Sequence, residues 1–179
     1  MNVIRNPSSL LSLLLASVCS LCFILPAFSA QAAQQVKINA PAPDFTLPTL
    51  EGKDLSLSSL QGKAVLVAFW SIYCHVCRQE LPKLNAICQK YKDQGLEVIG
   101  VAIDREPAQT IQEAVRKDGL SFPILLDGEK KAMKAYQARS VPIVFIVDRK
   151  GIVMDKKVGV YDWSSPASEE LIAMLLKKK

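Results

Sequence analysis

Two cysteines separated by two residues, Cys74 and Cys77, are the side chains of this chain best suited to redox chemistry. They follow an apolar run over 64–70, which predicts a buried strand, and they precede a segment with helical periodicity. Unpaired N–H groups and the positive end of the backbone dipole at the first turn of a helix stabilise a thiolate. A spacing of three residues places the second sulfur on the same helix face, within reach of a disulfide. We therefore predict that Cys74 attacks disulfides and that Cys77 resolves the mixed disulfide.

Metal or haem binding would explain the same pair less well. Zinc needs four ligands and the pair supplies two, while His75 is the sole histidine and Cys88 lies too far along the same helix. Haem attachment needs a histidine directly after the second cysteine, where this chain has Arg78. We therefore expect no metal site. Cys88 falls on an apolar helix stripe and is predicted to be a small buried residue.

The residues around the pair resemble those of a known family. The stretch 69–82, F-W-S-I-Y-C-H-V-C-R-Q-E-L-P, is similar to the W-x-x-W-C-x-P-C-R-x-E-x-P signature of the TlpA/ResA-like extracytoplasmic thiol–disulfide oxidoreductases. These proteins belong to the thioredoxin superfamily and are related to the AhpC/TSA proteins. Two further blocks, 42–47 and 136–151, match in the same order. The chain departs from the pattern at Tyr73, where tryptophan is usual, and at Val76, where proline is usual.

The resemblance implies a substrate site beside the cysteines. Pro142 matches a proline that is cis in the family and packs against the cysteine pair. Val141, just before it, would offer its backbone N–H and C=O to an extended substrate. His75 either donates a hydrogen bond to the Cys74 sulfur or lies solvated at the edge of the site. The residues that we expect to contact substrate are Trp70, Tyr73, His75, Val76 and Val141.

The proton acceptor for the thiol of Cys77, which we expect to be buried, is the least determined part of the predicted site. Thioredoxins proper place an aspartate on the strand before the motif, where this chain has Ala68. Relatives in the family use a glutamate in the loop after the second buried strand, and the resemblance therefore points to Glu106 in the loop 104–106. Glu80, one turn after Cys77, is the other candidate. The alternative is that both carboxylates only form surface ion pairs.

The first 32 residues predict export. Arg5 and an apolar run over 10–25 precede the small-residue pattern Ala30-x-Ala32, which is typical of a signal peptide cleaved before Ala33. The alternative is an uncleaved membrane anchor, although the 16 apolar residues are fewer than the roughly 20 that span a bilayer. In either case we expect a periplasmic or otherwise extracytoplasmic protein, where disulfide chemistry is normal. The remaining chain is nearly neutral and has no basic stripe, which argues against nucleic-acid binding.

Strand and helix patterns alternate along the rest of the chain, which indicates an α/β fold. We expect an extended lead-in over 33–42 and one thioredoxin-like domain over 43–179. Its central mixed sheet would be flanked by helices, with an N-terminal β-hairpin over 45–57 and a central αβ insertion. The strands are predicted over 64–70, 96–103, 122–126, 143–147 and 152–158. The helices are predicted over 75–94, 107–117, 129–136 and after Ser165, which would cap the last one.

The leading functional prediction is an enzyme that reduces disulfides of exported proteins, with cytochrome c maturation as one setting implied by the resemblance. The Cys74–Cys77 disulfide would be its only redox group, and we expect no other cofactor. Its partners would be protein disulfides and a membrane electron donor, and we expect a monomer. A thiol peroxidase of the peroxiredoxin type is the alternative: Ser71 stands three residues before Cys74, as in a peroxidatic site, but Val67 replaces the expected proline. A redox-inactive peptide-binding module is the third possibility, and the intact cysteines argue against it.

Overall fold

A mixed five-stranded sheet forms the centre of the computed structural model, which describes residues 36–177. The predicted signal segment and the first residues of the lead-in lie outside this range. The strand order is β5-β4-β3-β6-β7; the first three strands run parallel, and β6 and β7 are antiparallel to their neighbours. Their bounds are β3 (Ala64–Trp70), β4 (Leu96–Ala102), β5 (Ile124–Leu126), β6 (Ile143–Val147) and β7 (Val153–Val158).

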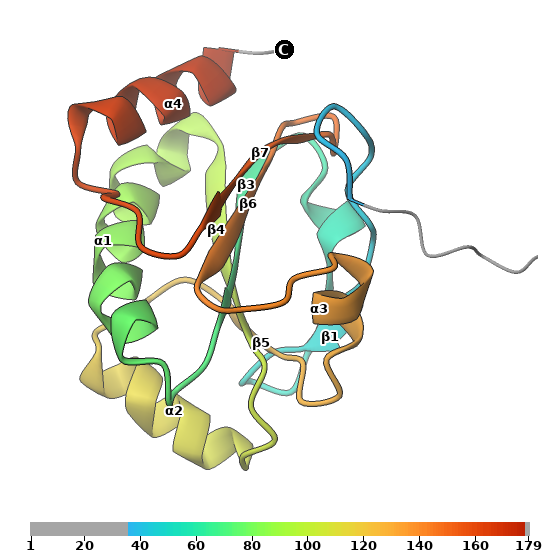
Figure 1. The fold of residues 1–179 in the computed structure, drawn as a ribbon, viewed down its shortest axis with the longest axis vertical. Helices are drawn as coiled ribbons and strands as arrows, with labels where there is room; N and C mark the ends of the chain where they lie inside the picture. Colours follow the sequence, from blue (N-terminus) through green and yellow to red (C-terminus); the bar gives the residue numbers. More distant parts are fainter. Residues whose placement is uncertain (1–35, 178–179) are drawn as a thin grey trace, which may run out of the picture. The chain divides into compact units, whose positions relative to one another are not determined.

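Helices cover one face of this sheet, and a helix and a hairpin cover the other (Figure 1). The two layers follow from the alternation of side chains along the buried strands. In β3, Leu66, Ala68 and Trp70 face the first core, while Val65, Val67 and Phe69 face the second. The first core is covered by α1 (His75–Tyr91), α2 (Ala108–Lys117) and α4 (Pro166–Lys177). The second is covered by α3 (Lys131–Ala135) and the antiparallel pair β1 (Thr46–Pro48) and β2 (Asp54–Ser56).

The observed architecture confirms the predicted fold class, and the differences lie at the ends of elements. The hairpin ends one residue early, because Leu57 begins a short 3₁₀ helix, η2 (Leu57–Leu60). The long helix ends at Tyr91, and a 3₁₀ turn, η3 (Lys92–Gln94), carries the chain to Gly95. Gly95 adopts a φ of 90°, a left-handed conformation that glycine enters without steric cost. At the last helix, the Ser165 hydroxyl accepts the N–H of Ser168, as predicted for its cap.

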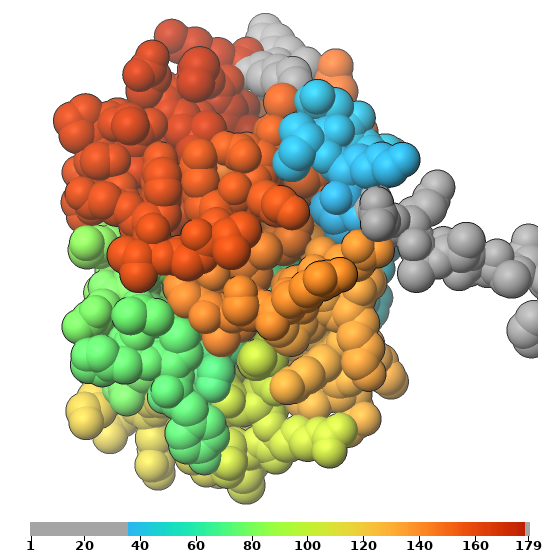
Figure 2. Space-filling model, viewed as in Figure 1, coloured from blue at the N-terminus to red at the C-terminus, as the bar shows by residue number. Residues whose placement is uncertain are grey.

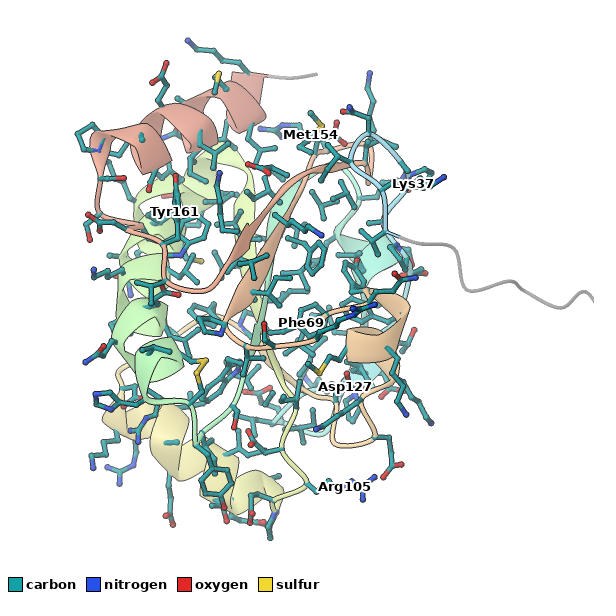
Figure 3. The ribbon with its side chains drawn as sticks, in the orientation of Figure 1. Lys37, Phe69, Arg105, Asp127, Met154 and Tyr161 are labelled. Atoms are coloured by element: carbon teal, nitrogen blue, oxygen red, sulfur yellow. A yellow bond between two sulfur atoms is a disulfide. The ribbon has the colours of Figure 1, made fainter. Side chains whose placement is uncertain are left out.

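Two buried aspartates organise turns at opposite ends of the sheet. The Asp127 carboxylate, after β5, accepts three backbone N–H groups at the start of α3, and Figure 3 shows this side chain beside that helix. The Asp148 carboxylate, after β6, accepts the N–H groups of Lys150 and Ile152 in the turn to β7. The lead-in also contributes here, because the Asn39 N–H donates to the Val153 carbonyl and thereby covers part of the edge of β7.

The part of the chain that is described, 36–177, contains no helix both long enough and apolar enough to span a bilayer.

Candidate active site

The two cysteines lie at the carboxyl end of β3, where the chain turns into α1. Their sulfur atoms are bonded, at 2.11 Å, and their Cα atoms are 5.2 Å apart. Cys74 is the N-cap of α1, and its Sγ accepts the N–H of Cys77 at 3.2 Å. Cys77 is only 1% exposed, whereas Cys74 is partly exposed. The first sulfur is therefore the one that a substrate can reach, and a helix N-terminus is available to stabilise its thiolate.

The start of β6 lies beside the accessible sulfur. The peptide bond between Val141 and Pro142 is cis, and the Val141 carbonyl oxygen is 3.9 Å from the Cys74 Sγ. The Pro142 carbonyl in turn accepts the N–H of Gly159 at 2.9 Å, which ties this segment to the end of β7. Figure 2 shows the start of α1, coloured green, beside the segment after β7, coloured orange-red. The fold therefore brings three distant segments together around Cys74.

Exposed apolar side chains surround this junction. Tyr73 is 73% exposed and Val76 is also exposed, both within the cysteine motif. Val158, which pairs with Ile143, and Val160 are exposed on the neighbouring segment. Sequence reasoning missed these two valines; the available signal was the apolar-glycine-apolar run over 158–160, where a strand ends.

Trp70 does not belong to this exposed set. It is 0% exposed and packs in the core between the sheet and α1, so the prediction that it contacts substrate is wrong. The reason is its position in β3, which places its side chain beneath the helix that carries the cysteines. Trp70 therefore supports the site from inside the protein.

The loop after β4 holds the turn that leads to Cys74. The Asp104 carboxylate accepts the Ser71 hydroxyl at 2.6 Å and the Ile72 N–H at 2.9 Å. The Ser71 hydroxyl oxygen accepts the N–H of Tyr73 at 3.1 Å. The sequence placed Asp104 in the predicted catalytic loop, but only the folded loop shows that this carboxylate faces the turn.

Glu106 and His75 have surface partners. The Glu106 carboxylate accepts the Tyr73 hydroxyl at 2.7 Å, and this hydrogen bond raises the pKa of Tyr73. The His75 Nε2 lies 3.1 Å from the amide nitrogen of Gln79 on the exposed side of α1. The role of Glu106 as proton acceptor stays a prediction, and the arrangement of His75 favours the solvated alternative.

Glu80 is the buried carboxylate of the site. It is 4% exposed, and its carboxylate accepts the backbone N–H of Tyr161. Figure 3 shows Tyr161 in the loop beside α1. Burial raises the pKa of Glu80, and the hydrogen bond from Tyr161 offsets part of that rise. One turn after Cys77, this carboxyl group has the environment expected of a proton acceptor for a buried thiol.

The remaining cysteine is set apart from the pair. Cys88 is a free thiol, buried between α1 and the sheet, and burial raises its pKa. This matches the predicted small buried residue. Among residues 36–177, no group of three or more histidine, cysteine or acidic side chains is arranged to hold a metal ion.

Comparisons with known proteins agree with this geometry. The model of the AhpC/TSA family matches residues 38–156. Thiol-disulfide oxidoreductase ResA of Bacillus thuringiensis (strain Al Hakam) is 33% identical over 126 residues, which are 70% of this chain and 72% of that protein. ResA of Geobacillus kaustophilus (strain HTA426) is 35% identical over 118 residues, 66% of this chain and 67% of that protein. The thioredoxin domain of a thiol-disulfide oxidoreductase from Bacteroides vulgatus has a TM-score of 0.69 and 28% identity, covering 77% of this chain and 99% of that chain. The chain therefore belongs to the AhpC/TSA family and, within it, to the ResA-like thiol–disulfide oxidoreductases.

Proposed function

We propose that this thiol–disulfide oxidoreductase reduces disulfides of exported proteins through Cys74 and Cys77. The observation that carries the proposal is the position of the partly exposed Cys74 Sγ, 3.9 Å from the Val141 carbonyl oxygen. An extended polypeptide that bonds to the backbone of Val141 would therefore bring its own disulfide to the accessible sulfur. The exposed side chains of Tyr73 and Val160 offer such a chain apolar contacts.

The reaction begins with both cysteines reduced. The Cys74 thiolate attacks one sulfur of the substrate disulfide, forms a mixed disulfide and releases the other substrate sulfur as a thiolate. The Cys77 thiol then loses its proton to a nearby base and attacks the Cys74 sulfur. This step closes the Cys74–Cys77 disulfide and releases the second substrate thiolate. Two electrons pass from the enzyme to the substrate, and a membrane electron donor of dithiol type would return them.

Glu80 is our first choice for the base, ahead of Glu106. A carboxylate accepts a proton from a thiol efficiently only if its own pKa has been raised toward that of the thiol. Burial raises the pKa of Glu80, whereas Glu106 is engaged by the hydroxyl of Tyr73 at the surface.

The hydrogen bonds of Ser71 argue against a peroxidase. In a peroxidatic site, a hydroxyl three residues before the cysteine must be free to contact the sulfur or the peroxide. Here the Ser71 hydroxyl donates its proton to Asp104, and its oxygen accepts the Tyr73 N–H. Val67, at the position where a peroxidase has proline, is buried inside β3. The arrangement therefore favours disulfide reduction.

The compartment follows from the predicted signal segment over 1–32 and from the chemistry itself, because protein disulfides form mainly outside the cytoplasm. We propose a periplasmic or otherwise extracytoplasmic enzyme that acts as a monomer. Intact-mass analysis of the protein from its native envelope should show a chain that starts at Ala33. Retention of Met1 would instead indicate a membrane-tethered enzyme.

Stopped-flow mixing of the fully reduced protein with two oxidants tests the activity. A peptide disulfide with apolar flanking residues should be reduced rapidly and with saturation. Hydrogen peroxide should be consumed no faster than by an ordinary thiolate of the same pKa. Rapid, saturating peroxide turnover with poor peptide reduction would overturn the proposal. Cys88→Ala is the matched control, since it removes a thiol outside the site and should leave both rates unchanged.

A further inference from the structure

Three consecutive backbone N–H groups in the turn between β3 and α1 have acceptors, and side chains supply two of these acceptors. Between Trp70 and the first residue of α1, the chain has no regular secondary structure. The N–H of Ile72 donates to Asp104, and the N–H of Tyr73 donates to the hydroxyl of Ser71. The N–H of Cys74 donates to the backbone carbonyl of Ser71 at 3.1 Å. Two of these three donors therefore depend on side chains.

Those two side chains act as one unit. The hydroxyl of Ser71 donates to the Asp104 carboxylate at 2.6 Å, which fixes the hydroxyl so that its oxygen points its lone pair toward the Tyr73 N–H. Ser71 is 9% exposed, so water competes little for these bonds. The loop is held to the turn by a backbone bond as well, from the Ile103 N–H to the Trp70 carbonyl at 3.1 Å. The position of Cys74 is thereby set by a charged group in the loop that follows a different strand, β4.

We propose that Asp104, acting through Ser71 and Ile72, is a positioning residue that holds the Cys74 sulfur within reach of Cys77. The inference rests on the proposed redox role of the pair, and it concerns how strongly the pair favours the disulfide. A restrained turn raises the effective concentration of one thiol toward the other and so favours ring closure. When the restraint is lost, the dithiol form gains conformational freedom that the disulfide form cannot have. The reduction potential should then become less negative.

The equilibrium of the Cys74–Cys77 pair with reduced and oxidised glutathione measures this reduction potential directly. The thiols are counted by alkylation and intact mass. Asp104→Asn leaves one acceptor oxygen for two donors, the Ser71 hydroxyl and the Ile72 N–H. Ser71→Ala removes the hydroxyl that links Asp104 to the Tyr73 N–H and keeps the bond from Ile72. For each variant we expect the equilibrium constant for disulfide formation to fall about tenfold, which is a shift of about 30 mV. Ser71→Thr, which keeps a hydroxyl, should stay within about twofold of wild type.

Asp148→Asn provides the matched control for stability. This buried carboxylate also supports a turn, but at the opposite end of the sheet, where it accepts the N–H groups of Lys150 and Ile152. The Asp148→Asn substitution should lower the melting temperature and leave the glutathione equilibrium unchanged. If Asp104→Asn and Ser71→Ala lose stability and keep the wild-type equilibrium, their role is only structural and the inference is wrong. An equal shift in Asp148→Asn would overturn it in the same way.

The proposed function can fail separately. If the wild-type protein equilibrates with glutathione but does not reduce peptide disulfides, the proposed reductase activity fails, and the shift in the variants still decides the inference. If the wild type reduces peptides and the variants keep its equilibrium constant, the inference alone fails. Should Asp104→Asn not fold, the pair Ser71→Ala and Ser71→Thr carries the same comparison with a smaller perturbation.

Discussion

Two substitutions of the buried Glu80 should separate the effect of its charge on stability from the effect of its hydrogen bond. Glu80→Gln removes the charge and keeps an oxygen that can accept the Tyr161 N–H. Glu80→Ala removes both and leaves that N–H without its acceptor. An unpaired buried donor costs about 1–3 kcal/mol of unfolding free energy. For a domain of this size, 1 kcal/mol corresponds to about 2–4 °C in melting temperature. We therefore expect Glu80→Ala to melt roughly 2–12 °C below Glu80→Gln.

The pH dependence of the melting temperature reports the effect of the Glu80 charge on stability. Burial raises the pKa of Glu80 in the folded protein above its ordinary value of 4.5, so the folded state holds this proton more tightly than the unfolded chain does. Between these two pKa values the folded state binds more protons, and stability must fall as the pH rises. Below pH 4.5 the wild type and Glu80→Gln should melt at similar temperatures. As the pH rises from 4.5 to the folded pKa, the wild type should fall below the variant, and above the folded pKa the offset should stay constant.

Calorimetric scans of the oxidised proteins at pH values from 4 to 8 provide the measurement. The difference between wild type and Glu80→Gln, at each pH, cancels the contributions of all other titrating groups that the two proteins share. A wild type that becomes more stable than Glu80→Gln as the pH rises would refute the reasoning. It would mean that the Tyr161 N–H stabilises the anion by more than burial penalises it, so that Glu80 would be a poor proton acceptor for Cys77.

Three further outcomes can be checked on the same protein. Cys77→Ser should accumulate mixed disulfides through Cys74 on gels run without reductant, while Cys74→Ser should trap few, because the attacking sulfur is gone; equal trapping would reverse the assignment. The Cys88 thiol should resist alkylation in the native protein, since it is buried with a raised pKa, and it should label at once in denaturant. Rapid native labelling would contradict its burial. Glu106→Gln should lower the pKa of Tyr73 in an absorbance titration, because the carboxylate that favours the protonated hydroxyl is lost, and an unchanged titration would show that the hydrogen bond does not form in solution.

The architecture could be predicted because its central strands are buried on both faces. The runs 64–70 and 96–102 are almost continuously apolar, and such runs leave little choice of structure. Ends of elements were less determined. Leu57 continues the alternation of β2 in sequence and packs into the core beneath the hairpin, yet it begins a 3₁₀ helix.

The site was predictable where a local spacing specifies the chemistry and was missed where contacts span the chain. The spacing of Cys74 and Cys77 places both at one helix start. No local pattern tells which of the polar residues in the loop 104–106 turns toward the cysteines, because that depends on the loop conformation. The contact of Glu80 with Tyr161 joins residues 81 positions apart and needs the whole sheet to be in place. Trp70 was expected to contact substrate because it adjoins the motif, although it ends a strand that is buried on both faces.

The short separation of the two cysteines also has a consequence for the durability of the enzyme. A cross-link between residues only three apart removes little freedom from the unfolded chain, about 2 kcal/mol in the loop-entropy estimate, against nearly 5 for a loop of about 100 residues. Opening this bond therefore costs the native state less than half of what opening a long-range disulfide would cost. Cys77 lies in the first hydrophobic core, but the other side chains of the two layers pack without the bond. The protein can thus lose and regain its disulfide at each turnover while the surrounding fold remains intact.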